Sequence, residues 1–117
     1  MKKSRVRSRQ GHRYAKYLAA DLKNSHSVLD LGCGSSSPLQ YLTVPYSVGI
    51  DINMPAIEES KKKKIHTEYI CADISTIEFP ENSFDVVLAT DCVEHLAKDD
   101  GFSLIAKMEK WARDKVS

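Results

Sequence analysis

At 117 residues and a formal net charge of +1, the chain is short enough to form a single domain. Its 42% hydrophobic and 28% charged residues are typical of a soluble globular protein. No apolar run approaches the roughly 18 residues needed to span a bilayer, and no secretory signal follows the basic start. These features argue against a membrane-spanning or secreted protein.

The cysteines and histidines follow no disulfide or metal-binding pattern. The three cysteines are odd in number, lie far apart and include no C-x-x-C pair, and the four histidines are scattered. We therefore expect a cytoplasmic protein, kept in a reducing setting and without a bound metal. The residues are Cys33, Cys71, Cys92, His12, His26, His66 and His95.

Charge is distributed unevenly along the chain. Residues 1–17 contain seven basic residues and no acidic one, whereas the remaining hundred contain ten basic and sixteen acidic residues. We expect a flexible basic arm over residues 1–10, followed by one domain over residues 11–117. Three interpretations of the basic stretch 2–16 stay open: a solvated tail, a contact with nucleic acid, or a targeting signal.

The first third of the chain predicts a helix, a strand and a second helix. Apolar residues recur at helical spacing between Gly11 and Lys23, which predicts the first helix. His26–Leu31 is apolar and short, as in a buried strand. Ser36 or Ser37 can then cap a helix that has Pro38 at its first position.

The middle of the chain repeats this alternation. Tyr46–Asp51 predicts a second strand, and a helix follows from about Met54 to Lys64. The run Lys61–Lys64 closes that helix, where cations favour the negative end of the helix dipole. Glu68–Cys71 predicts a third strand.

The last third begins with the most apolar run of the chain. Phe84–Thr90 predicts a strand that is covered on both faces. Asp99 or Asp100 can cap a final helix. We expect the inner face of this helix to carry Phe102, Leu104, Ile105, Met108 and Trp111.

Alternating strands and helices at this spacing predict an α/β fold, a Rossmann-like parallel sheet flanked by helices. Ligands of such sheets bind at the carboxyl ends of the strands. Acidic residues stand at or just after the ends of all four predicted strands: Asp30, Asp51, Asp73 and Asp91.

The stretch from Asp30 to Gly34, written DLGCG, places a carboxylate just ahead of a glycine turn. Gly32 and Gly34 allow a tight turn and a close approach of a ligand, and we expect the helix behind them to aim free N–H groups at the same place. A phosphate there would meet Asp30 at a cost of about 1–4 kcal/mol for charges about 4 Å apart. A cationic nucleoside such as S-adenosylmethionine, which carries an ammonium and a sulfonium, removes that conflict.

Two further acids suit the same ligand. Asp51 ends the second strand, where it can accept hydrogen bonds from both ribose hydroxyls, although dinucleotide sites use the same device. Asp73 can accept from an adenine amino group, and the backbone N–H of Ile74 can meet a ring nitrogen. Taken singly, each acid is more simply a turn or cap residue.

These residues give the chain a resemblance to the class I S-adenosylmethionine-dependent methyltransferases, in particular the type 11 methyltransferase-domain group. The matching stretches are VLDLGCGSSS (28–37), VGIDIN (48–53), ICADI (70–74) and FDVVLATDCVEHL (84–96). The resemblance implies S-adenosyl-L-methionine as cofactor and a Glu94–Leu96 helix start, without a catalytic role for His95. The implied cofactor-binding residues are Asp30, Gly32, Cys33, Gly34, Asp51, Ile52, Asp73, Ile74, Thr90 and Asp91.

The resemblance also implies a difference in length. Members continue through a fifth parallel strand and an antiparallel pair, and we expect this chain to stop where the fifth strand begins, as a truncated form with strand order 3-2-1-4. Strand 84–90 would then lie at an edge, and exposed apolar edges invite pairing with another chain. Self-association through this strand follows as an expectation.

The resemblance implies transfer of a methyl group from S-adenosylmethionine to an acceptor. Residues 90–93, TDCV, lack the N-P-P-Y or D-P-P-Y pattern of enzymes that methylate base amines, which favours a small-molecule acceptor. Three alternatives stay open: a non-catalytic module that binds the cofactor or a partner chain, an RNA methyltransferase, and an NAD-dependent oxidoreductase. No catalytic residue is predicted.

Overall fold

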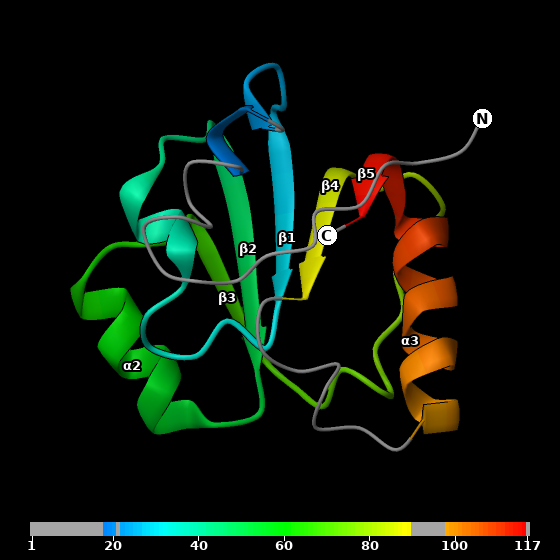
Figure 1. Cartoon of the computed structure of the whole chain (residues 1–117). Coiled ribbons are helices and arrows are strands. Elements are labelled where there is room, and N and C mark those ends of the chain that lie inside the picture. Colours follow the sequence, from blue (N-terminus) through cyan, green and yellow to red (C-terminus); the bar gives the residue numbers. More distant parts are fainter. Residues whose placement is uncertain (1–17, 21, 90–97, 117) are drawn as a thin grey trace.

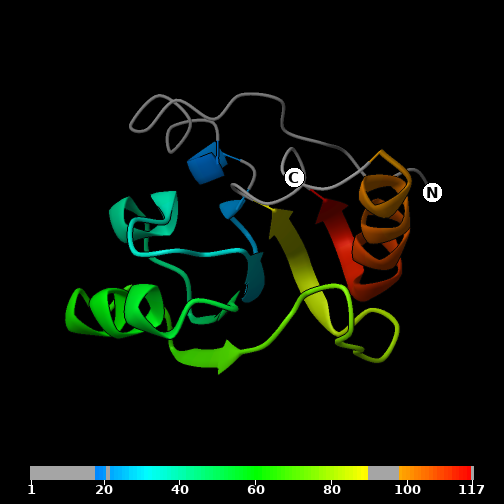
Figure 2. The same cartoon turned by 90° about the horizontal axis from the view of Figure 1, so that it is seen from below.

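The computed structural model describes residues 18–20, 22–89 and 98–116. Five strands form one parallel sheet in the order β3-β2-β1-β4-β5. Figure 1 shows helices α2 and α3 on opposite sides of the strands, and Figure 2 shows the same separation from below. The predicted α/β class is confirmed. The elements are β1 (Ser27–Leu31), η1 (Pro38–Tyr41), β2 (Tyr46–Asp51), α2 (Met54–Lys62), β3 (Glu68–Cys71), β4 (Phe84–Ala89), α3 (Lys98–Trp111) and β5 (Ala112–Val116).

The expected absence of a fifth strand is wrong. β5 follows α3 directly and pairs in parallel with β4, with Phe84 opposite Ala112 and Val87 opposite Val116. β4 therefore lies between β1 and β5, and all six of its residues are buried. Because β4 is not an edge strand, the argument for self-association through strand 84–90 is also overturned.

One face of the sheet packs against α3. Side chains alternate across a strand, so Leu29 of β1 and Val87 of β4 point to the same face. They share an apolar cluster with Leu104, Met108 and Trp111 of α3, all buried. Trp111 is fully buried, which confirms it as a core residue.

The opposite face has a second, smaller apolar cluster. Val28 of β1 and Leu88 of β4 contact Leu39 of η1 there. Leu18 and Leu22 belong to the same cluster, and residues 18–20 and 22 are helical, so the described part of the predicted helix 11–23 is confirmed. Between these apolar residues and α2, the same face of the sheet buries polar side chains.

The helix ends differ from expectation in three places. After Pro38 there is one 3-10 turn in place of a longer helix, with Ser37 as its cap. α2 ends at Lys62, two residues early, because Lys64 takes a positive φ of 55° that no α-helix continues. α3 begins at Lys98, ahead of both acids that were expected to cap it.

Some expectations fall on residues that the structure does not describe. These are the basic arm 1–10, the nucleic-acid contact over residues 2–16, the helix start at 94–96, and Thr90 and Asp91. Within the described ranges, no helix is both long enough and apolar enough to cross a membrane.

Candidate functional site

The candidate site lies at the carboxyl ends of β1, β2 and β3. The parallel register sets Leu31 beside Ile50 and Asp51 beside Cys71, so the segments that follow these strands leave the sheet at one edge. They are the glycine turn Gly32–Gly34, then Asp51 and Ile52, then Asp73 and Ile74. Eight of the ten predicted cofactor-binding residues can therefore be placed; Thr90 and Asp91 lie outside the described residues.

The glycine turn has the backbone conformation that its sequence predicts. Gly32 and Gly34 have φ angles of 65° and 59°, in the left-handed region that side chains with a Cβ rarely adopt. A Cβ placed on Gly34 would meet no atom within 4 Å, so open space lies in front of the turn. A ligand can approach the backbone there.

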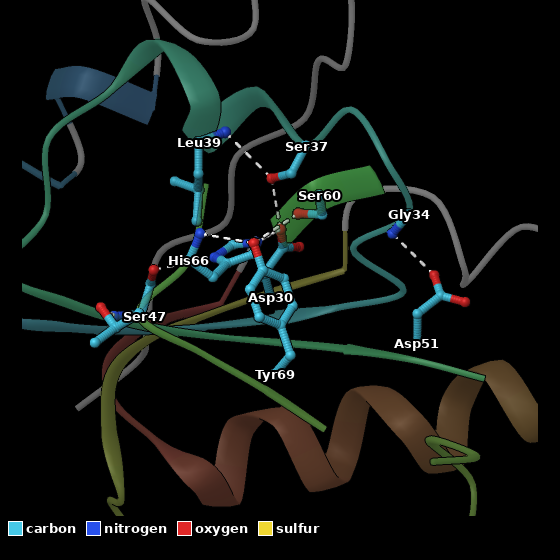
Figure 3. Close-up of polar contacts among 10 residues, drawn as sticks. Asp30, Gly34, Ser37, Leu39, Ser47, Asp51, Ser60, His66 and Tyr69 are labelled. Atoms are coloured by element: carbon cyan, nitrogen blue, oxygen red, sulfur yellow. Dashed lines mark hydrogen bonds and ion pairs between the residues drawn. The ribbon is translucent and has the colours of Figure 1, made fainter. Parts of the chain in front are cut away.

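Asp51 is fixed against this turn. Its Oδ2 accepts a hydrogen bond of 2.8 Å from the backbone N–H of Gly34, and its Oδ1 accepts one of 2.8 Å from the N–H of Asn53. Figure 3 shows the carboxylate of Asp51 directed at Gly34. The side chain is half-buried, so it stays accessible from the edge of the sheet.

The turn is poorly suited to phosphate, because several backbone N–H groups already have partners. Cys33 N–H donates to the carbonyl of Ile50, Gly34 N–H donates to Asp51, and Leu39 N–H donates to Oγ of Ser37 at 3.2 Å. The expected helix that would aim free N–H groups at a ligand is a single 3-10 turn. This arrangement disfavours an anionic dinucleotide.

Asp30 lies beneath the turn and not at its surface. The side chain is fully buried, and its Oδ2 accepts a hydrogen bond of 2.5 Å from Oγ of Ser37. Nε2 of His66 lies 3.1 Å from the same oxygen, at ion-pair distance but without the alignment of a hydrogen bond. A ligand bound at the turn would interact with Asp30 only electrostatically, without direct contact with its carboxylate.

Cys33 lies within the turn as a buried thiol. Burial raises its pKa from 9.0 to about 12, and the carboxylates of Asp30 and Asp51 add to the shift. The thiol therefore stays neutral at physiological pH. Its role here is to fill space beneath the turn, where its Sγ approaches Gly49.

The segment that follows β3, with Asp73 and Ile74, is more exposed than the glycine turn. Asp73 Oδ1 accepts hydrogen bonds from the backbone N–H and the hydroxyl of Ser75, at 2.9 and 2.8 Å, and these bonds hold the pKa of the carboxyl below its ordinary value. Ile74 is half-buried against the core. Ile52, beside Asp51, is 69% exposed, an apolar side chain that a flat aromatic ring could cover.

Sequence reasoning missed the residue that connects these elements. His66, in the loop before β3, lies with its ring on the face of the sheet over Gly49, and its Nδ1 shares a hydrogen bond of 3.0 Å with Oγ of Ser47 (Figure 3). The signal was available: Ser47 and Gly49 interrupt an otherwise apolar strand with one polar and one very small residue. That pattern indicates a polar group packed on the strand.

The model of the family described as a methyltransferase domain matches residues 29–115. This span includes most of β1, all of β2 to β4 and most of β5. The chain belongs to this methyltransferase-domain family.

Curated relatives include two phosphoethanolamine N-methyltransferases. The one from Triticum aestivum is 37% identical over 100 residues, 80% of this chain and 20% of that protein. The one from Plasmodium falciparum is 35% identical over 101 residues, 80% of this chain and 37% of that protein. The chain thus spans between a fifth and two fifths of these relatives.

Solved structures share the fold. The plantazolicin methyltransferase BpumL, in complex with a pentazolic desmethylPZN analog and SAH, superposes with a TM-score of 0.67 at 25% identity, over 87% of this chain and 41% of that one. The amino pentose methyltransferase CalS10 from Micromonospora echinaspora reaches 0.71 at 19% identity, over 85% and 45%. The second similarity concerns the fold alone.

Proposed function

We propose that this chain is the cofactor-binding part of an S-adenosylmethionine-dependent methyltransferase that acts on a small-molecule acceptor. Family membership supports the reaction class. The observation that carries the proposal for this chain is Asp51, whose carboxylate is held by Gly34 beside an open glycine turn. That combination provides an acceptor for sugar hydroxyls next to a surface that a ligand can approach closely.

The charge of the site distinguishes this cofactor from its rivals. Asp30 and Asp51 place two carboxylates at the turn, while the ammonium of Lys63, which contacts the segment, donates to Ser35 and Ser36. The N–H groups of Cys33, Gly34 and Leu39, which could otherwise bind phosphate, have partners within the protein. S-adenosylmethionine supplies an already activated methyl group on a cationic sulfur. The residues described here would bind and orient it, and orientation alone contributes up to about 7–11 kcal/mol in well-aligned reactions.

Different residues would bind different parts of the cofactor. Gly32, Cys33 and Gly34 would pass beneath it, and Asp51 would accept from the ribose hydroxyls. Ile52 would pack on the adenine ring, while Asp73 and Ile74 would bind its edge. Thr90 and Asp91 keep their expected place beside the methyl donor as a prediction.

The test is isothermal titration calorimetry with S-adenosylhomocysteine. The unmodified chain should bind at a ratio of one to one, and Asp51→Ala should weaken binding by at least about tenfold, since a hydrogen bond to a charged acceptor is lost. Asp114→Ala, an exposed acid on β5, is the matched control and should leave affinity unchanged. Absence of binding by the unmodified chain, or thermal stabilisation by NAD in its place, would refute the proposal.

Acceptor chemistry needs a transfer assay with labelled methyl groups. Relatives named for phosphoethanolamine and for (S)-coclaurine make small amines the first acceptors to try. RNA is the second class of acceptor to test, because the basic stretch 2–16 could bind it. Cofactor binding without transfer to any acceptor would favour a non-catalytic binding module.

A further inference from the structure

A hydrogen bond between two side chains connects the two ends of the segment that forms the glycine turn. Asp30 precedes the turn and Ser37 follows it, and the hydrogen bond of 2.5 Å between their side chains joins the two ends of the segment. Ser37 Oγ also accepts from Leu39 N–H, which ties the segment to η1. The position of the Asp30 carboxylate is therefore one of the constraints on residues 31–36, beside the hydrogen bonds from Cys33 to Ile50 and from Gly34 to Asp51.

His66 places its imidazole against that carboxylate. Its side chain, like that of Asp30, has no exposed surface, and Nε2 lies 3.1 Å from Oδ2 of Asp30. On its other side, Nδ1 shares the hydrogen bond with Ser47 of β2. The imidazole thus spans from β2 to the base of the turn, as Figure 3 shows.

The ring of His66 is itself fixed by its surroundings. Its backbone N–H donates to the hydroxyl of Tyr69 at 3.0 Å, and the same hydroxyl bonds Ser60 of α2 at 2.8 Å. The rings of His66 and Tyr69 meet edge to face at 5.4 Å. On the strand side, a Cβ at Gly49 would come within 2.5 Å of the imidazole, so this glycine makes room for the ring.

We propose that His66 is a positioning residue for the cofactor: through Asp30 and Ser37 it sets the conformation of the glycine turn on which the cofactor lies. The inference rests on the proposed function, because it concerns the same binding site. His66 makes no contact with the ligand in this arrangement. The ionisable groups that face the ring are Asp30 on one side and the Tyr69 hydroxyl on the other, with the Cys33 thiol packed beside it over Gly49.

The experiment compares binding of S-adenosylhomocysteine by variants along this chain of contacts. His66→Leu removes both ring contacts and replaces the imidazole beside Asp30 with an apolar side chain, and should weaken binding about tenfold. His66→Gln keeps an amide near Asp30 and should restore affinity to within about threefold. Ser47→Ala, which touches neither turn nor ligand, should weaken binding about threefold by releasing Nδ1.

Two measurements separate positioning from general destabilisation. Leu104→Ala, in the α3 core, should lower the thermal midpoint at least as much as His66→Leu and leave affinity unchanged. If His66 had only a structural role, His66→Leu would lower the thermal midpoint and leave the affinity of the folded protein unchanged.

The outcomes distinguish the two proposals. If the unmodified chain does not bind S-adenosylhomocysteine, the proposed function fails. If it binds, and His66→Leu and Ser47→Ala bind equally well, the role of His66 is refuted and the proposed function stands. Should His66→Leu not fold, Ser47→Ala decides, and unchanged affinity in that variant refutes the role.

Discussion

The face of the sheet under α3 buries an apolar cluster, whereas the opposite face combines a smaller apolar cluster with buried polar side chains. Under α3, Trp111 and Met108 pack on apolar residues, and the ring of Phe79 meets those of Trp111 and Phe84 edge to face at 5.2 and 5.3 Å. Under the glycine turn, the opposite face buries Asp30, Ser37, Ser47 and His66. Apolar contacts have little directional preference, whereas these polar groups each require a particular partner. We infer that the first region supplies stability and the second fixes geometry.

Trp111→Ala breaks the apolar region and should have the largest effect. Truncating a fully buried tryptophan costs about 3–5 kcal/mol of unfolding free energy, and urea unfolding measures the loss. Affinity of the folded fraction for S-adenosylhomocysteine should stay within about twofold. Trp111→Phe is the matched control: it keeps a ring against Phe79 and removes Nε1, a buried N–H that has no hydrogen-bond partner among the described residues. Trp111→Phe should cost far less stability than Trp111→Ala. A loss below about 1 kcal/mol for Trp111→Ala would contradict the assignment of Trp111 to the core.

Gly49→Ala breaks the polar region from inside. The new methyl group would lie 2.5 Å from the imidazole of His66 and 3.0 Å from Sγ of Cys33, so the ring has to move. We expect a loss of about 1–3 kcal/mol of stability and, unlike Trp111→Ala, weaker binding of S-adenosylhomocysteine.

A double-mutant cycle tests the cause of the Gly49→Ala effect. In a His66→Ala background the added methyl group meets no imidazole, so Gly49→Ala should cost much less there. If the stability losses of Gly49→Ala and His66→Ala simply add, the imidazole of His66 is not what limits the space at Gly49.

The comparison of the two faces also explains which parts of the structure the sequence predicts. The bounds of β2 and β3 were predicted correctly because Tyr46, Val48 and Ile50 alternate along β2, and β3 contains the strand formers Tyr69 and Ile70. β5 was missed because Ala112–Val116 follows α3 without a glycine or proline, and three charged residues separate its two apolar ends. Its strand conformation comes from pairing with β4 and not from a local pattern.

The polar network was out of reach for a different reason. His66 is 19 residues from Ser47 and still further from Asp30, and no short motif joins them. The resemblance assigned Asp30 to the ligand, whereas its burial places it under the turn, a difference that only the fold shows. Gly32, Gly34 and Asp51 lie together as expected, because they belong to adjacent strand ends.

The smallest expected effect concerns Cys33, which lies between the buried polar groups and the ligand surface. Its pKa is raised from 9.0 to about 12, so between these values the folded state binds more protons at this thiol than the unfolded state does. The stability of the protein should therefore fall as pH rises above 9, by about 1 kcal/mol at pH 10 from this group. Urea unfolding of the unmodified chain and of Cys33→Ala at pH 8 and pH 10 isolates the contribution, because the lysines and tyrosines are common to both. The unmodified chain should lose more stability over this interval than the variant does. Equal losses of stability in the two proteins would mean that the thiol ionises as easily in the folded as in the unfolded chain. The buried polar region would then be more hydrated than its burial indicates.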